Sequence, residues 1–434
     1  MKRHLSLWAT TLLTALVNIP VSTAAQTDHW ITSWTASPQP VWDESFIFPT
    51  NLPATLKDQS IIQNARISLG GNRFRLVLGN EYGNTPMVIG HASVRLEQGS
   101  KNTTVQPTAV TFHGQTVARI MPGARLISDP IALPIPDLSQ VTVALYLPEP
   151  TPVQTFHWDA RQTSWLVAGD QTASVTAPSQ LGDALSSTAR AILSGIEVNT
   201  NQQASTVAVL GDSITDGATA SLDTNSRWTD FLAQRLIREN QAVINAGISG
   251  ARLLVDGMGE NALARLEQDV LSQPGVKTLI VLMGINDIAW PGTAFAPDSQ
   301  MPSLDQLTEG YRQLVRLAKR QGIRVLVATL PPFKGALPDT PLDNYYQPEK
   351  DQLRLTLNHW FRTSDIFAGV IDMAAILEDP HNRGYLNPVY DSGDHLHPGD
   401  RGNQAMAESI SLSLLKPSAS PHRSATLTQT GTGE

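Results

Sequence analysis

From about residue 204 onward, short apolar segments alternate with longer amphipathic ones, and this alternation constrains the fold more than any other feature of the sequence. The apolar segments are TVAVLGD, VINAG, KTLIVLMG, RVLVATLPP and GVIDM, and the stretches between them have helical periodicity, as in LDQLTEGYRQLVRLAKRQG. Buried strands that alternate with helices form parallel sheets with helices on both faces. We therefore predict an α/β domain over residues 204–416 with a flavodoxin-like, five-stranded parallel sheet. Ligands bind such sheets at the carboxyl ends of the strands.

Residues 28–201 have a different pattern. Short alternating stretches such as RFRLVLGNEYG and VTVALYLPEP are interrupted by Pro, Gly and Asn. In the first of these, Phe74, Leu76 and Leu78 stand at every second position, which is typical of a half-buried strand. This half predicts an antiparallel all-β domain, a sandwich or jelly roll.

Both ends of the chain lie outside these two domains. Residues 1–25 contain a basic start, an apolar run and two closing alanines, which together predict a cleaved signal peptide and a secreted or periplasmic protein. A membrane anchor is the alternative, but the run is shorter than the roughly 20 apolar residues of a spanning helix and contains Thr and Asn. The tail, 417–434, has no periodicity and is predicted to be disordered.

Composition excludes several classes of function. The chain has no Cys, so it has neither a thiol nucleophile nor a thiolate metal site. Acidic residues outnumber basic ones, 39 to 31, and beyond the first residues there is no basic run of the kind that nucleic acids bind. We expect no nucleic-acid partner, no stable membrane insertion and no cofactor.

Three segments place polar or glycine residues directly after a predicted strand. In VAVLGDSITDG, Ser213 follows a strand and a glycine, which suits a nucleophile, although a Ser in this position is also a common turn former or helix cap. In VINAGISG, Gly247 and Gly250 allow a substrate oxygen to approach the backbone N–H groups, or simply permit a tight turn. In VLMGINDIAW, Asn286 offers an amide donor, and Asp287 caps or braces the loop.

The fourth segment, DSGDHLHPGD, contains a carboxylate and an imidazole three residues apart. Asp394 next to His397 would hold the imidazole tautomer and stabilise the imidazolium, as a base that activates a serine requires. The alternative is a metal site built from Asp391, Asp394, His395 and His397. We favour the first interpretation, because no second cluster of ligands occurs in the sequence and an acidic loop alone is a poor zinc site.

Taken in order, GDSIT, NAGISG, GIND and DHLHP resemble the sequence blocks of the SGNH, or GDSL, hydrolases. The resemblance covers roughly residues 206–415. It implies that Ser213 is the nucleophile, that Asp394 and His397 activate it, and that the oxyanion hole consists of Ser213, Gly250 and Asn286. The implied reaction is hydrolysis of a carboxylic ester without metal or cofactor.

Two details of the resemblance need comment. The donor glycine of the family closes an NxxxxG element, which here runs from Asn245 to Gly250, so Gly250 matches better than Gly247. His395 is a departure, because a small residue often stands at this position in the family. The spacing from Asp394 still favours His397 as the base. The first half, with HWITSWTASPQP, is similar to the β domain of exported relatives found beside xylan-degrading enzymes.

The substrate is less well defined by the sequence. Export and the resemblance favour short-acyl, mainly acetyl, esters of carbohydrates. The loops after Asn286 and after the fourth strand offer few apolar walls for a long chain, and their aromatic residues are Trp290, Phe295, Phe333, Tyr345 and Tyr346.

Two other classes of function compete with the acetyl esterase. A lysophospholipase, lipase or thioesterase of the same family would use the same catalytic set. A non-catalytic carbohydrate-binding protein would need only the β domain and its aromatic residues, which are Trp30, Trp34, Trp42, Trp158 and Trp165.

Overall fold

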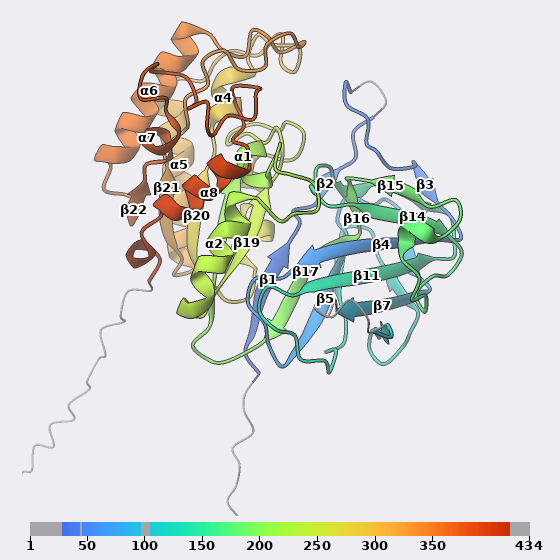
Figure 1. Ribbon diagram of the computed structural model, residues 1–434. Coiled ribbons are helices and arrows are strands. Elements are labelled where there is room, and N and C mark those ends of the chain that lie inside the picture. The colour runs from blue at the N-terminus through green and yellow to red at the C-terminus, as the bar shows by residue number, and fades with distance from the viewer. Residues whose placement is uncertain (1–27, 44–45, 97–104, 417–434) are drawn as a thin grey trace, which may run out of the picture.

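The computed structural model describes residues 28–43, 46–96 and 105–416 (Figure 1). The predicted signal peptide and the predicted disordered tail lie outside these residues. In the described part of the chain, no helix combines the length and apolarity needed to cross a membrane.

The second half contains the predicted parallel sheet. Its strands are β18 (Ser205–Gly211), β19 (Gln241–Gly247), β20 (Val276–Leu282), β21 (Arg324–Ala328) and β22 (Gly369–Ile371). They lie in the order β19-β18-β20-β21-β22, and every neighbouring pair is parallel. The order reverses at β18, and the crevice at such a reversal is where ligands bind in open α/β sheets.

Helices cover both faces of this sheet. The longer ones are α2 (Trp228–Leu236), α5 (Leu304–Arg320), α6 (Pro348–Thr363) and α8 (Asp400–Ser409), and the shorter ones are α1 (Ser213–Asp216), α3 (Ala262–Leu266), α4 (Ile285–Ala289) and α7 (Met373–Leu377). Single turns of other helix types continue two of them, namely η2 (Ile237–Glu239) after α2 and a π-helical turn η3 (Glu267–Leu271) after α3. A separate 3-10 turn, η4 (Leu412–Leu414), follows α8. In Figure 1, α2 and α8 lie together on one face, and α5 and α6 lie on the other. The flavodoxin-like prediction is therefore confirmed.

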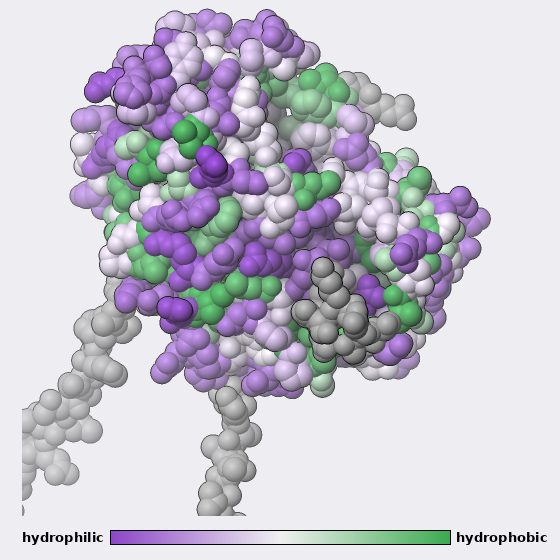
Figure 2. All heavy atoms as spheres, in the orientation of Figure 1, coloured by the Kyte–Doolittle hydropathy of each residue, from purple (hydrophilic) through white to green (hydrophobic). Residues whose placement is uncertain are grey.

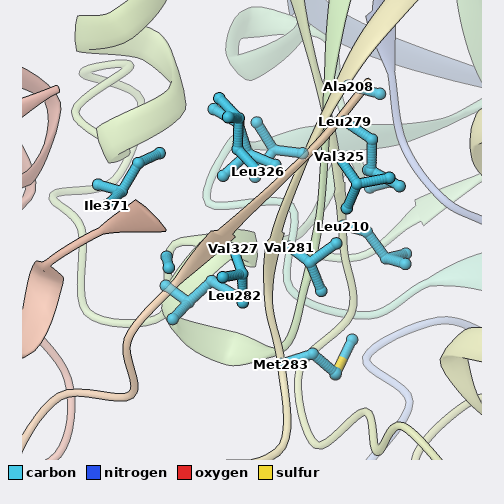
Figure 3. Close-up of a cluster of buried hydrophobic side chains, with 14 of the residues drawn as sticks. Ala208, Leu210, Leu279, Val281, Leu282, Met283, Val325, Leu326, Val327 and Ile371 are labelled. Atoms are coloured by element: carbon cyan, nitrogen blue, oxygen red, sulfur yellow. The ribbon is translucent and has the colours of Figure 1, made fainter. Parts of the chain in front are cut away.

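The core of this half lies between the sheet and the helices. Figure 3 shows buried side chains of β18, β20, β21 and β22, among them Leu210, Val281, Val327 and Ile371, which belong to one apolar cluster. The strands are apolar on both sides because both sides are covered.

The first half consists of antiparallel sheets, as predicted. Its elements are β1 (Trp30–Thr35), β2 (Gln39–Pro40), β3 (Thr55–Leu56), β4 (Gln59–Arg66), β5 (Arg73–Asn80), β6 (Met87–Ile89), β7 (His91–Leu96), β8 (Thr108–Ala109), β9 (Ala118–Ile120), β10 (Ala124–Ile127), β11 (Gln140–Leu147), β12 (Thr151–Pro152), β13 (Thr155–His157), β14 (Ser164–Ala168), η1 (Pro178–Gln180), β15 (Leu185–Ser187), β16 (Arg190–Ala191) and β17 (Leu193–Asn199).

Two of these sheets are large, with the orders β1-β17-β5-β10 and β15-β14-β4-β11-β7-β8. Phe74, Leu76 and Leu78 of β5 belong to the same buried cluster as Ile61 of β4 and Val143 of β11. The two sheets therefore enclose one apolar core, which is the arrangement of a β-sandwich.

Strand β1 joins the two halves, and Figure 1 shows it between the sandwich and the parallel sheet. The backbone N–H of Thr32 donates to the carbonyl of Pro274 at 2.8 Å, and the hydroxyl of Thr206 donates to the carbonyl of Thr32 at 2.9 Å. The hydroxyl of Thr35 donates to the carbonyl of Asn245, also at 2.9 Å. These bonds fix the β domain against the sheet, from the amino ends of β18 and β20 to the carboxyl end of β19.

The surface is mixed in character. On the face shown in Figure 2, hydrophilic and hydrophobic residues are interspersed, and green atoms gather beside the grey segment at the upper right.

Candidate active site

Ser213 lies at the carboxyl end of β18, where the strand order reverses. It is the first residue of α1, and the preceding Asp212 caps this helix by accepting a hydrogen bond from Ile214 N at 3.0 Å. A side chain at Gly211 would come within 2.1 Å of the Thr215 hydroxyl and 2.9 Å of the Leu282 carbonyl. The glycine thus allows the tight passage from strand to helix that brings Ser213 to the surface of the crevice.

A chain of hydrogen bonds connects Ser213, His397 and Asp394. The hydroxyl of Ser213 is 2.8 Å from Nε2 of His397, and Nδ1 of His397 is 2.6 Å from Oδ2 of Asp394. The other carboxylate oxygen of Asp394 accepts hydrogen bonds from the backbone N–H groups of Leu396 and His397, at 3.0 and 2.8 Å. The carboxylate is therefore fixed in position, and it orients the imidazole toward the serine.

The surroundings of Asp394 keep it ionised. Burial alone would raise the pKa of its carboxyl, but the hydrogen bond and charge of His397, together with the backbone N–H groups, outweigh burial and lower the pKa well below its ordinary value. An ionised Asp394 is the form that can stabilise a positively charged imidazole next to it.

Two further groups lie at the same pocket as Ser213, namely the backbone of Gly250 and the amide of Asn286. Gly250 has a φ of +71°, and its N–H donates no hydrogen bond to any other described residue. The amide nitrogen of Asn286 donates to the Ala251 carbonyl at 3.0 Å, which uses one of its two hydrogens. The second hydrogen remains for a ligand oxygen.

Asn286 is held in a defined orientation. Its side-chain oxygen accepts a hydrogen bond from the Tyr345 hydroxyl at 2.7 Å, so the nitrogen faces the other way. Asp287 accepts hydrogen bonds from the N–H groups of Leu253 and Leu254, at 2.7 and 3.0 Å. Asp287 thus braces the loop that contains Gly250, as one of the two interpretations of its sequence position expected.

The two glycines that the sequence offered have different roles. Gly247 lies against α1, since a Cβ there would come within 2.3 Å of Asp216 N. Its own N–H donates to the side chain of Asn245 at 2.8 Å. Gly250 borders the pocket instead, and a Cβ there would meet Met258 at 2.6 Å and Trp290 at 2.8 Å.

His395 and Asp391 form a pair of their own, separate from His397 and Asp394. The distance from His395 Nδ1 to Asp391 Oδ2 is 2.5 Å, and His395 has a φ of +60°. Among the residues that the structure describes, no group of three or more His, Asp or Glu side chains is arranged to hold a metal ion.

The pocket at Ser213 has a volume of about 440 Å³ and draws its walls from both halves of the chain. The α/β half contributes mostly apolar residues around the polar groups described above. They are Met258, Trp290, Phe295, Leu337, Leu342, Tyr345 and Leu396. Of the aromatic residues expected from the two loops, Trp290, Phe295 and Tyr345 line the pocket, whereas Phe333 is fully buried and packs against Tyr345 and Tyr346.

Sequence reasoning missed the contribution of the β domain, which consists of Phe48, Trp158, Asp159 and Arg161. No motif marks these residues, and they are more than 50 positions from Ser213 in the sequence. From the sequence, the aromatic residues of the first half suggest only a carbohydrate-binding protein. Their place at the pocket depends on how the two domains pack, which local sequence patterns do not encode.

Residues 209–405 match the model of the GDSL-like lipase/acylhydrolase family. No curated protein matches the chain.

Several solved structures match about half of the chain. An acetylxylan esterase from Geobacillus stearothermophilus is 21% identical, with 50% of this chain and 96% of that chain covered and a TM-score of 0.36. An aryl esterase from M. smegmatis is 17% identical, with 47% and 95% covered and a TM-score of 0.37. A GDSL-like lipase from Bacteroides thetaiotaomicron is 18% identical, with 48% and 87% covered and a TM-score of 0.36. Residues 209–405 are therefore a domain of the GDSL-like lipase/acylhydrolase family.

Proposed function

We propose that this protein is an exported serine esterase that hydrolyses carboxylic esters through an acyl-enzyme, with Ser213, His397 and Asp394 as its catalytic residues. The observation that carries the proposal is the continuous hydrogen-bonded chain from the Ser213 hydroxyl through His397 to Asp394, at 2.8 and 2.6 Å. A nucleophile within hydrogen-bond reach of a base that a third group orients is the arrangement that activates a serine.

The reaction has two steps. In the first, Ser213 Oγ attacks the ester carbonyl while His397 Nε2 takes the hydroxyl proton, and collapse of the tetrahedral intermediate releases the alcohol, which takes that proton. In the second step, His397 removes a proton from water, the resulting hydroxide attacks the acyl-enzyme, and Ser213 leaves with the proton. The N–H groups of Ser213 and Gly250 and the amide of Asn286 donate to the oxyanion in both steps.

We further propose that the substrates are short-acyl esters of carbohydrates, acetyl esters above all. The aromatic and charged lining of the pocket supports a sugar-bearing substrate, because sugars bind to aromatic rings flanked by polar groups. A lysophospholipase, lipase or thioesterase is the second candidate. The apolar walls at Met258, Leu337, Leu342 and Leu396 favour it, because they would also accept an alkyl chain.

Export and the division of the chain belong to the same proposal. The signal-peptide pattern at 1–25 supports a protein that is secreted or periplasmic. The exported chain would consist of the β domain at 28–201, the hydrolase domain at 204–416 and the tail at 417–434. Expression of the whole chain and N-terminal sequencing of the exported product would test the cleavage near Gln26. An uncleaved, membrane-associated product would contradict export.

The catalytic proposal has a direct test. The purified protein and its Ser213→Ala variant are incubated with acetylated xylan, acetylated pectin and lysophospholipid, and the acid released is measured. We expect acetate release by the wild type alone, and labelling of the wild type alone by a serine-reactive fluorophosphonate. Equal activity or equal labelling of both proteins would exclude Ser213 as the nucleophile. Release of acid from lysophospholipid alone would favour the second candidate.

A further inference from the structure

A loop of the β domain forms part of the wall of the pocket at Ser213. The loop follows β13 and contributes Trp158, Asp159 and Arg161, and Phe48 from an earlier loop also lines the pocket. The rings of Phe48 and Trp158 are stacked, with centroids 5.2 Å apart and planes inclined by 20°. Phe48 also contacts Phe295 of the hydrolase domain, at 5.5 Å between ring centroids. One aromatic wall therefore spans both domains.

Direct hydrogen bonds hold this loop against the hydrolase domain. Arg161 Nε donates to the carbonyl of Ala220 at 2.8 Å, in the segment that follows α1. The carboxylate of Asp223 accepts hydrogen bonds from the N–H and the hydroxyl of Thr163, both at 2.6 Å. The wall is thus a fixed part of the site, which costs little conformational entropy when a substrate binds.

The contacts place this wall on the same side of Ser213 as His397. Ala220, to which Arg161 binds, is adjacent to Thr219, and the Thr219 hydroxyl lies 3.3 Å from the carbonyl of Pro398, the residue after His397. In the proposed reaction, His397 returns its proton to the departing alcohol. The alcohol part of the ester must therefore lie on the His397 side, next to the loop of the β domain.

The chemistry of the loop suits a group with several hydroxyls. Asp159 receives no hydrogen bond from any described residue, its side chain is 15% exposed, and its Oδ1 lies 3.8 Å from Nη1 of Arg161. Burial, and next the charge of Asp216, raise the pKa of Asp159, so the ionised carboxylate is unfavourable in the folded protein without a ligand. A hydroxyl that donates to Asp159 and accepts from Arg161 would offset that cost, and the ring of Trp158 would contact the face of a sugar.

We propose that Trp158, Asp159 and Arg161 form a subsite for the leaving alcohol, and that this alcohol is a pyranose whose ring lies against Trp158 and whose hydroxyls bind Asp159 and Arg161. The inference rests on the proposed esterase function and adds to it that the β domain selects the alcohol. It assigns to the β domain a direct contact with substrate.

The test compares two acetyl esters that differ only in the alcohol, namely methyl 3-O-acetyl-β-xylopyranoside and ethyl acetate. The whole protein is assayed with both, as are Trp158→Ala and Asp159→Asn, the second of which preserves the shape of the side chain. In Trp158→Ala, we expect kcat/KM for the xyloside to fall at least tenfold more than kcat/KM for ethyl acetate. In Asp159→Asn, we expect the fall for the xyloside to be at least threefold larger than that for ethyl acetate. Both losses should come from a higher KM for the xyloside. Trp165→Ala is the matched control, because Trp165 lies on β14 and does not line the pocket. It should leave the ratio unchanged.

Each other outcome has a defined meaning. If the ratio of kcat/KM for the xyloside to kcat/KM for ethyl acetate is unchanged in both variants, the subsite is overturned. A wild type that cleaves ethyl acetate but not the xyloside also overturns the subsite. In both cases the esterase function stands. Ethyl octanoate, assayed as a third ester, tests whether the wall binds the acyl chain instead. A selective loss on this ester in Trp158→Ala overturns the subsite too. If the wild type cleaves none of these esters and resists the fluorophosphonate, the esterase function itself fails, and the subsite with it.

Discussion

Nε2 of His157 in the β domain lies 2.9 Å from Oδ1 of Asp216, the last residue of the helix that begins with Ser213. The second oxygen of Asp216 accepts hydrogen bonds from the N–H and hydroxyl of Ser249, at 2.9 and 2.8 Å. One buried carboxylate thus connects the β domain, the nucleophile helix and the residue before Gly250. The β domain supports the geometry of the site in addition to lining it.

Replacing His157 with Ala should destabilise the protein and lower its activity. The change removes a buried partner of Asp216, and leaving a buried polar group without a partner costs about 1–3 kcal/mol. Thermal unfolding and kcat on a short ester measure the two effects. His91→Ala is the control, because its pair with Asp170 is exposed and should be worth less than about 1 kcal/mol. Equal unfolding temperatures for the two variants would contradict the role of His157.

Asn286→Ala should lower kcat by about a hundredfold to a thousandfold, the usual cost of losing one oxyanion donor. Its unfolding temperature should change much less than its activity. Tyr345→Phe removes only the hydroxyl that orients the amide, so its loss of kcat should be smaller than that of Asn286→Ala. A variant without Asn286 that keeps near-normal turnover would exclude this residue from the oxyanion hole.

The fold was largely readable from the sequence, because parallel strands buried on both faces leave long apolar segments. The strand that ends at Gly211 and those that end at Gly247 and Leu282 match the predicted segments closely. The two short helices at the site were missed. Both α1 and α4 have fewer than six residues, which is too short to give a helical pattern.

The candidate site was readable for a different reason. Ser213 and Asn286 each follow a strand in a recognisable block, so their meeting follows from the parallel sheet. His397 lies in the DHLHP block, in the loop between α7 and α8. Trp158 and Arg161 were not assigned to this site, because the packing of two domains brings them to the pocket. Tyr345 was expected only as a wall of the pocket. Its hydrogen bond to Asn286 was not expected, because that contact depends on the course of a long loop.

The two histidines of the DHLHP segment should behave differently. His397→Ala should lower kcat by about a thousandfold or more, because the serine loses its base. His395→Ala should retain activity within about tenfold, since His395 is paired with Asp391 and is absent from the pocket lining. Steady-state kinetics on one short ester checks both variants. A larger loss in His395→Ala than in His397→Ala would reverse the assignment.

Alanine at the two glycines of the NAGISG segment should separate stability from activity. In Gly247→Ala, the new Cβ would meet the backbone of α1 at 2.3 Å, so we expect a clear fall in unfolding temperature. In Gly250→Ala, the new Cβ would meet the side chains of Met258 and Trp290, and the φ of +71° is unfavourable for alanine. We therefore expect mainly a lower kcat. Gly322→Ala has a similar positive φ with no atom nearby, and it controls for backbone strain alone. Equal kinetic losses in Gly250→Ala and Gly322→Ala would exclude a special role for Gly250.

Asp212 should make the stability of the protein depend on pH. Burial raises the pKa of its carboxyl from 3.8 to about 7, so the folded protein holds a proton that the unfolded chain releases between these values. The stabilisation from this proton is complete below about pH 4 and is lost as the pH rises through 7. Asp212→Asn cannot ionise and keeps an oxygen for Ile214 N, so it should unfold at a higher temperature than the wild type at pH 8, with the difference shrinking toward pH 5.

Asp372 provides a control of opposite sign for the Asp212 measurement. It caps α7, as Asp212 caps α1. Burial would raise the pKa of Asp372, but its hydrogen bonds and ion pair with Arg362 outweigh burial and lower the pKa. Its stabilisation is therefore present at neutral pH and lost on acidification, so Asp372→Asn should lower the unfolding temperature at pH 8. If Asp212→Asn also lowered the unfolding temperature at pH 8, the Asp212 carboxyl would have to be stabilised as an anion, and burial would not be the dominant influence on it.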